Sequence, residues 1–207
     1  MRVLMIAPPG AGKGTQGARI AAHFGVPHLA TGDLLRRHVA RGTSLGRTVQ
    51  DYLDRGSLVP DRVMQDLVRR ALADATAAGG GYVLDGYPRT PAQAWAAYQI
   101  ATSLGATAEV ALHLRVDDDE VVRRLLSRAG IEHRSDDTEP VIRRRLALYH
   151  EVTEPILDWY DRRGILLSVD GMPSPDQVTA DVIAALGTRR GQCVSRPGPV
   201  PELLAAA

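Results

Sequence analysis

The stretch APPGAGKGT, residues 7–15, joins an apolar run at residues 3–6 to a segment over residues 13–24 that is predicted to be helical. A buried strand, a glycine-rich turn and a helix in this order are the context that a phosphate-binding loop requires. Gly10, Gly12 and Gly14 let the backbone approach a polyphosphate without a Cβ in the way. The amides at the helix start point at the anion, and the helix dipole adds attraction. The stretch therefore predicts a phosphate-binding loop; a glycine-rich turn without a ligand is the alternative interpretation.

Two side chains of this loop are predicted to act on a bound phosphate. Lys13, the one lysine among the 25 basic residues of the chain, supplies a full positive charge to the phosphoryl group. Thr15 supplies a hydroxyl ligand for Mg²⁺. Ala7 stands where the pattern G-x-x-x-x-G-K opens with glycine, so the loop forms only if φ is negative there or if strain is tolerated.

Short apolar runs alternate with segments of helical periodicity, which predicts an α/β fold with a parallel sheet covered by helices on both faces. Strands are expected at residues 3–6, 28–29, 82–84, 110–114 and 165–169. Helices are expected at residues 13–24, 44–54, 61–77, 90–104, 118–128, 139–162 and 175–186. One further helix is expected to be capped by Thr31 and to continue through Val39. Residues 188–207 have no apolar period and are expected to form a disordered tail.

The composition restricts the possible classes of function. The 207 residues fit one domain, and 44% hydrophobic residues are enough to build a core. A formal net charge of +1 and an aromatic content of 4% argue against a nucleic-acid-binding protein, which needs a basic excess and rings for stacking. Cys193, the one cysteine, cannot form an internal disulfide or a thiolate zinc site. Because no apolar run reaches about 18 residues, we expect no membrane span, and we expect a cytoplasmic location.

Three further parts of the sequence resemble the adenylate kinase family. They are TGDLLR at residues 31–36, LDGYPRTPAQ at 84–93, and an arginine-rich stretch with RRLLSR at 123–128, RSDD at 134–137 and RRRL at 143–146. The resemblance extends from residue 1 to about residue 186, in the family's order and spacing. It implies a three-layer fold like that of the P-loop nucleoside triphosphate hydrolases, with a central five-stranded parallel sheet. It also implies an ATP:AMP phosphotransferase that depends on Mg²⁺ and produces two ADP.

The resemblance further implies subsites and segments. A kinase core would span residues 1–187, with an acceptor-binding insert at 31–59 and a short lid at 129–137, which is expected to be a simple loop without zinc. The implied ATP-binding residues are Gly10, Ala11, Gly12, Lys13, Gly14, Thr15, Arg124, Arg128, Gly171 and Met172. The implied AMP-binding residues are Thr31, Arg36, Ser57, Leu58, Val59, Gly86, Arg89, Gln93, Arg134 and Arg145. The implied catalytic residues are Lys13, Arg89, Arg124, Arg128, Arg134 and Arg145.

Asp85 has a predicted role that the residues alone support. It ends an apolar strand, and ligands of open parallel sheets bind beyond the carboxyl ends of the strands. Its carboxylate is therefore placed to orient Mg²⁺, through water, beside the phosphate-binding loop. Capping of the next helical segment is the alternative.

The three arginines of the predicted helix over residues 139–162 are expected to face different directions. Its apolar positions are expected to form one buried stripe, made of Ile142, Leu146, Tyr149 and Ile156. Arg145 lies about 60° from the centre of that stripe at 3.6 residues per turn, and Arg143 and Arg144 lie farther round. Of the three, only Arg145 is therefore expected to face the interior edge.

Two other functions remain open on the sequence. One is a kinase for UMP, CMP or GMP, because Ala7 and the short lid leave room for a different acceptor. The other is a nucleotide-binding protein without catalysis, which should lack some of the charged site residues, whereas all are present. The expected partners are small-molecule nucleotides, with no nucleic acid and no membrane, and the expected state is a monomer.

Overall fold

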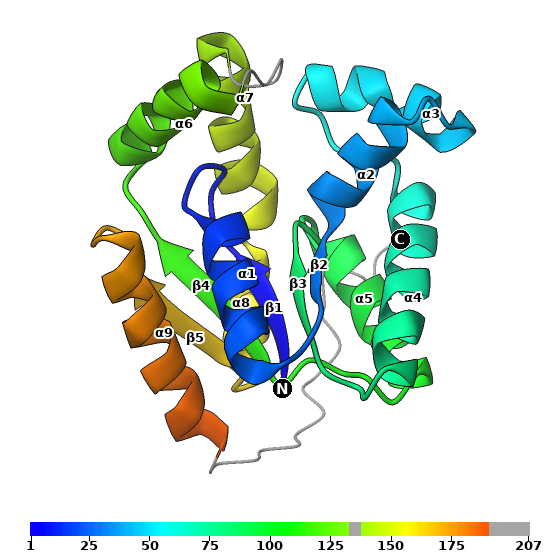
Figure 1. Ribbon diagram of the computed structural model, residues 1–207, viewed down its shortest axis with the longest axis vertical. Coiled ribbons are helices and arrows are strands. Elements are labelled where there is room, and N and C mark those ends of the chain that lie inside the picture. Colours follow the sequence, from blue (N-terminus) through cyan, green and yellow to red (C-terminus); the bar gives the residue numbers. More distant parts are fainter. Residues whose placement is uncertain (133–137, 191–207) are drawn as a thin grey trace.

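The computed structural model describes residues 1–132 and 138–190. In this part of the chain a five-stranded parallel sheet lies between layers of helices (Figure 1). Its strands pair in the order β2-β3-β1-β4-β5. Along the chain they are β1 (Arg2–Ile6), β2 (His28–Ala30), β3 (Tyr82–Asp85), β4 (Val110–Arg115) and β5 (Leu166–Asp170). The predicted α/β fold with five parallel strands is confirmed.

The helices connect and cover these strands. They are α1 (Lys13–Phe24), α2 (Thr31–Ala40), α3 (Ser44–Asp54), α4 (Asp61–Ala77), α5 (Pro91–Ser103), α6 (Asp118–Glu132), α7 (Glu139–Leu148), α8 (Ile156–Arg162) and α9 (Pro175–Arg190). A π-helical segment, η1 (Tyr149–Thr153), follows α7 directly. No helix in the described part of the chain combines the length and the apolar composition that crossing a membrane requires.

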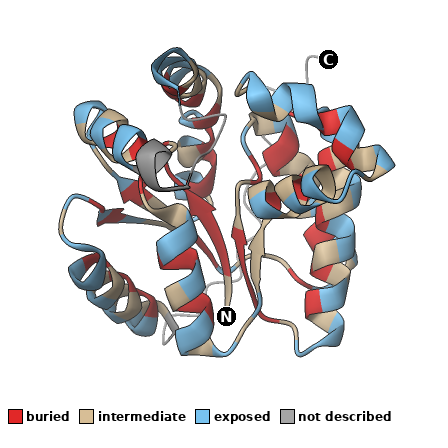
Figure 2. Ribbon diagram, turned by 45° about the horizontal axis from the view of Figure 1, so that its top comes forward, coloured by how far each residue is buried: buried red, intermediate tan, exposed pale blue. Residues whose placement is uncertain are grey.

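Both faces of the sheet are buried, so the central strands contain continuous buried runs at residues 3–6, 82–84 and 110–112. On β1, Val3 and Met5 belong to a cluster that includes α1 and α9, whereas Leu4 and Ile6 belong to one that includes α4, α5 and α8. This alternation follows from the two-residue period of a strand. Figure 2 shows the buried residues on the sheet and on the inward faces of these helices.

The prediction of one continuous helix over residues 139–162 is wrong. The chain forms α7, then η1, and α8 begins only after Pro155. Proline has no N–H to donate and its ring clashes with the carbonyl four residues earlier, so an α-helix cannot continue unchanged through it. The predicted buried stripe is nevertheless confirmed, since Ile142, Leu146, Tyr149 and Ile156 are all buried.

Three other expectations about helix ends need correction. Thr31 is the first residue of α2 and not its cap: the preceding Ala30 takes that place, and the Thr31 hydroxyl donates to the Asp85 carbonyl at 3.0 Å. Helix α6 continues to Glu132, so residues 129–132 of the expected lid are helical and not loop. Helix α9 continues to Arg190, past the expected start of the tail at residue 188. The remaining lid residues 133–137 and tail residues 191–207 lie outside the described residues.

Strand β1 is the point at which the connections diverge. Its neighbours are β3 on one side and β4 on the other. In open α/β sheets, a crevice forms beyond the carboxyl ends of the strands at such a point. Residues 7–15 follow β1 there and lead into α1, so the topology places the predicted phosphate-binding loop at this crevice.

Candidate functional site

A cleft of about 910 Å³ opens beside the loop at residues 7–15. The arm formed by α6 and α7 lies on one side of this region and the α2–α3 pair lies on the other (Figure 1). Of the sequence-predicted site residues, those that line the cleft are Gly10, Ala11, Gly12, Lys13, Gly14, Thr15, Arg36, Leu58, Asp85, Gly86, Arg89, Arg124, Arg145, Gly171 and Met172. Most of the predicted site is thus brought together in one cavity.

The glycine loop has the backbone that a phosphate cradle needs. Gly10 and Gly12 have φ values of 83° and 90°, which side-chain-bearing residues rarely adopt. Gly12 is the N-cap of α1 and, having no side chain, makes no cap hydrogen bond to the amides at the start of this helix. A Cβ on Gly10 would also lie 2.6 Å from Leu125 Cγ, so the loop packs closely against α6.

Lys13 folds back over its own loop in this structure. Its Nζ donates to the carbonyls of Ala7 at 2.7 Å and Pro8 at 2.8 Å. The ammonium group is therefore held at the cleft wall by two main-chain oxygens. Ala7 is buried and provides one of them, so the loop forms with alanine at the position where the usual pattern has glycine.

Three arginines from separate elements line the same cleft: Arg36 from α2, Arg89 from the β3–α5 connection and Arg145 from α7. Although the Arg89 side chain is open to the cleft, its pKa is lowered, first because nearby protein displaces water and then because Arg145 and Arg36 lie close. Asp85 acts in the opposite direction and raises this pKa. Cations gathered in this way favour a ligand with more than one negative charge.

The local contacts of these arginines differ. The Arg36 guanidinium forms an ion pair of 2.6 Å with Asp33, three residues earlier on α2. Arg89 Nε donates to the Gly86 carbonyl at 2.9 Å. Arg145 is half-buried, and its side chain lies so close to Gly56 that a Cβ there would come within 2.8 Å of Arg145 Cγ.

The predicted orientation of Arg145 is confirmed by its neighbours on α7. Arg143 and Arg144 are exposed and do not line the cleft, whereas Arg145 is half-buried and does. Arg143 instead pairs with Glu139 along the helix surface at 2.8 Å.

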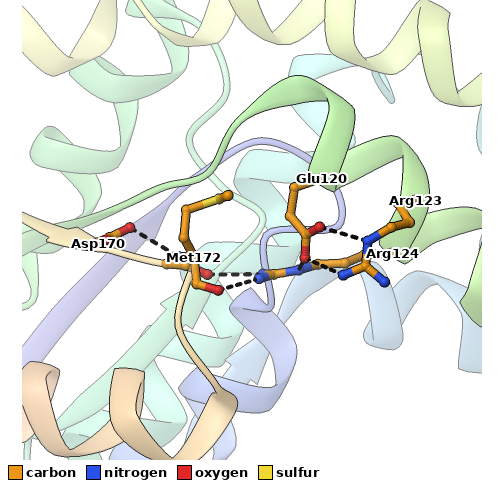
Figure 3. A network of polar contacts seen from close by, with 6 residues as sticks. Glu120, Arg123, Arg124, Asp170 and Met172 are labelled. Atoms are coloured by element: carbon orange, nitrogen blue, oxygen red, sulfur yellow. Dashed lines mark hydrogen bonds and ion pairs between the residues drawn. The ribbon is translucent and has the colours of Figure 1, made fainter.

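A second polar network connects α6 to the loop that follows β5 (Figure 3). Arg124 Nε donates to Glu120 at 2.6 Å, and its two terminal nitrogens donate to the carbonyls of Gly171 at 3.0 Å and Met172 at 3.2 Å. Arg123 also donates twice to Glu120, at 2.7 Å each. Hydrogen bonds from Arg123 and then Arg124 lower the pKa of the Glu120 carboxyl to about 2. Arg124 is thereby fixed beside Gly171 and Met172 at one end of the cleft.

Four predicted acceptor residues are not on the cleft wall of this structure: Thr31, Ser57, Val59 and Gln93. Thr31 is buried, and its hydroxyl holds the end of β3. Gln93 is also buried; its Nε2 donates to Asp61 at 2.7 Å, and its Oε1 accepts the Arg89 N–H at 2.9 Å. Both polar atoms of the Gln93 amide thus have partners within the protein, and its implied role in binding AMP stays a prediction.

Two predicted arginines lie beyond what the structure describes. Arg128 is in α6, but its side chain is outside the described residues, and Arg134 is outside them altogether. Their roles stay predictions.

The oxygen donors that Mg²⁺ prefers are present at the cleft. The hydroxyl of Thr15 and the carboxylates of Asp85 and Asp33 all line it. Magnesium takes few protein ligands and keeps several waters, so this donor set fits the ion. Within residues 1–132 and 138–190, no three His, Cys, Asp or Glu side chains gather in a way that could hold a metal. The expected absence of zinc stays an expectation.

Two residues that contact the site residues were not found from the sequence. Glu120 could have been found, because residues three and four apart on a helix are neighbours and Arg123 and Arg124 follow it at that spacing. Thr153 contacts the main chain of Arg89 at 2.8 Å, and no sequence signal pointed to it.

Comparison with known proteins gives one consistent family. A family model described as adenylate kinase matches residues 5–165. An adenylate kinase of Thermus thermophilus is 46% identical over 185 residues, which cover 89% of this chain and 96% of that protein. One of Kocuria rhizophila is 49% identical over 185 residues, covering 89% and 98%. One of Thermobifida fusca is 44% identical over 189 residues, covering 91% and 100%.

Proposed function

The chain belongs to the adenylate kinase family, whose reaction is the reversible transfer of a phosphoryl group from ATP to AMP. We propose which of its cleft residues bind ATP and which bind AMP. The chain is a phosphotransferase, a nucleoside monophosphate kinase. One observation supports this assignment most: the Lys13 loop and three arginines from separate elements line one cleft. A polyphosphate and a second phosphate can therefore meet within it.

The donor side is the glycine loop together with the network of α6. The loop amides from Gly10 to Thr15 bind the triphosphate, and Lys13 exchanges its two carbonyl partners for phosphate oxygens. Arg124, Gly171 and Met172 form the donor nucleotide's end of the cleft. Arg128 adds a cation to the transferring group.

The acceptor side is the set of three arginines. Arg36, Arg89 and Arg145 hold the phosphate of AMP, and Leu58 and Gly86 form the wall beside the nucleoside. Thr31, Ser57, Val59 and Gln93 reach the nucleoside only when the insert at residues 31–59 moves inward. Arg134, which lies outside the described residues, would add a further cation to this set.

Phosphoryl transfer requires positioning and charge stabilisation more than covalent chemistry. A Mg²⁺ ion, held by Thr15 and through water by Asp85, would neutralise charge on the phosphate oxygens. Lys13 and the arginines stabilise the negative charge that spreads over the transferring group. Closure of the insert and the lid excludes water, which would otherwise accept the phosphoryl group.

A screen of acceptors tests this function. With purified protein, ATP and Mg²⁺, a coupled assay compares AMP, GMP, CMP and UMP. We expect the highest kcat/KM for AMP. If AMP gives the lowest value, the chain is a kinase for another monophosphate; if no acceptor is phosphorylated, the catalytic assignment fails.

A further inference from the structure

We propose that Thr153 is a positioning residue for the acceptor phosphate, acting through the main chain of Arg89; this rests on the function proposed above. The Thr153 hydroxyl donates to the Arg89 carbonyl at 2.8 Å, across 64 residues of sequence. Thr153 is buried, with 8% of its surface exposed. Thr153 also lines the cleft, and its contact with Arg89 is partly buried.

The direction of this hydroxyl differs from that of three other described helical threonines, although Thr31, the first residue of α2, also donates to another element. Thr48, Thr76 and Thr188 each donate to the carbonyl four residues earlier in their own helix. That is the ordinary local partner of a helical threonine. Thr153 instead directs its hydroxyl to another element.

The chain around Thr153 also departs from the α-helical pattern in which those three threonines lie. Four residues before Thr153 lies Tyr149, whose carbonyl accepts the N–H of Glu154 at 2.8 Å, five residues along the chain. Pro155 follows and offers no N–H to restore the α-helical pattern. The hydroxyl of Thr153 bonds outside this π-helical segment, and π-helical turns recur at functional sites.

Thr153 completes a set of contacts that fixes Arg89. The Arg89 N–H donates to Gln93 Oε1. Gln93 Nε2 in turn donates to Asp61, and this bond orients the amide with its oxygen toward Arg89. The Arg89 carbonyl is held by Thr153. The peptide groups on both sides of Arg89 are therefore anchored, one by the α4–α5 layer and the other by η1.

Such anchoring matters because Arg89 lies among like charges. Arg145 and Arg36 are close enough to lower its pKa, so mutual repulsion tends to separate the three side chains. A fixed backbone at Arg89 limits that movement and keeps the guanidinium ready for the acceptor phosphate. Small displacements of a binding group are costly in phosphoryl transfer, since catalysis depends on position.

Kinetics of Thr153→Val test the proposal. Valine keeps the shape and removes the hydroxyl, so we expect KM for AMP to rise about five- to tenfold, the range for one lost hydrogen bond. KM for ATP should stay at the wild-type value. Thr153→Ser keeps the hydroxyl and should restore wild-type KM for AMP. Thr76→Val is the matched control, because it removes a similar hydroxyl whose bond stays within α4.

The outcomes distinguish a failure of this proposal from a failure of the proposed function. If the wild-type protein phosphorylates no monophosphate, the proposed function fails. If it phosphorylates AMP and Thr153→Val has an unchanged KM for AMP, or equal rises in KM for both substrates, Thr153 does not position the acceptor site. Should the valine variant not fold, Thr153→Ser decides: a wild-type KM for AMP supports the proposal and a raised one overturns it.

Discussion

A single methyl group at position 46 should disrupt the acceptor insert. Gly46 lies in the first turn of α3, where this helix packs against the end of α2. A Cβ on Gly46 would overlap the carbonyl group of His38 and lie 2.7 Å from the Val39 nitrogen. These are backbone atoms of α2, so no side chain can rotate away. The two helices would have to separate.

The cost of Gly46→Ala follows from this geometry. Overpacking typically costs about 1–3 kcal/mol, and the upper end applies when only backbone can move. A loss of about 3 kcal/mol lowers Tm by roughly 6–12 °C in a chain of this size. Because Arg36 is on α2, we also expect KM for AMP to rise while KM for ATP stays close to wild type.

The control for this variant is Gly187→Ala. Gly187 is in α9, and nothing lies within 4 Å of a Cβ built there. Replacing an exposed helical glycine by alanine should stabilise the protein by about 0.5–1 kcal/mol without changing either KM. Urea unfolding followed by far-ultraviolet circular dichroism, with initial rates at varied AMP and ATP, measures both effects. Wild-type stability in Gly46→Ala would refute the close approach of α2 and α3.

Two further predictions concern charge. Lys13→Met should reduce kcat by about 10³-fold, with Tm lower by only a few degrees because two carbonyl contacts are lost. The control Arg143→Met removes an exposed cation and should leave kcat unchanged. Equal losses of kcat in both variants would contradict the catalytic assignment of Lys13. Hydrogen bonds from His150 to Glu154 and Asp118 raise the pKa of the His150 imidazole. The contribution of these bonds to folding stability is therefore complete below about pH 6.5, and it is lost as the pH rises through the raised pKa. Urea midpoints from pH 5.5 to 8.5 should therefore fall less steeply in His150→Gln than in the wild type; identical slopes would exclude this bridge.

The sequence predicted those features that depend on local pattern. Apolar runs located the strands because both faces of the sheet are buried, and Gly10 and Gly12 marked the loop because their φ values exclude most other residues. The angle of Arg145 on its helix was also sufficient to predict that it faces the interior edge, since orientation on one helix depends only on the helical period.

Features that depend on a distant partner were not predictable in the same way. Thr31 has the residue type of a cap, but the end of β3 lies within reach and takes its hydroxyl. Gln93 was expected among the AMP-binding residues, and its contacts with Asp61 and the Arg89 N–H could not be read from the sequence. Only the tertiary structure brings these side chains and their partners together.

The resting partners of the cleft cations explain how a site rich in positive charge coexists with a folded, nearly neutral chain. Lys13 is held by two carbonyls, Arg36 by Asp33 and Arg124 by Glu120. Each contact limits repulsion among the cations before any nucleotide arrives. On the proposed function, Lys13 and Arg36 would exchange these partners for phosphate oxygens, so part of the binding energy would be used to break internal contacts. Arg124 donates to three acceptors, one on α6 and two after β5, so on the same proposal it would keep its contacts while Lys13 and Arg36 exchange theirs.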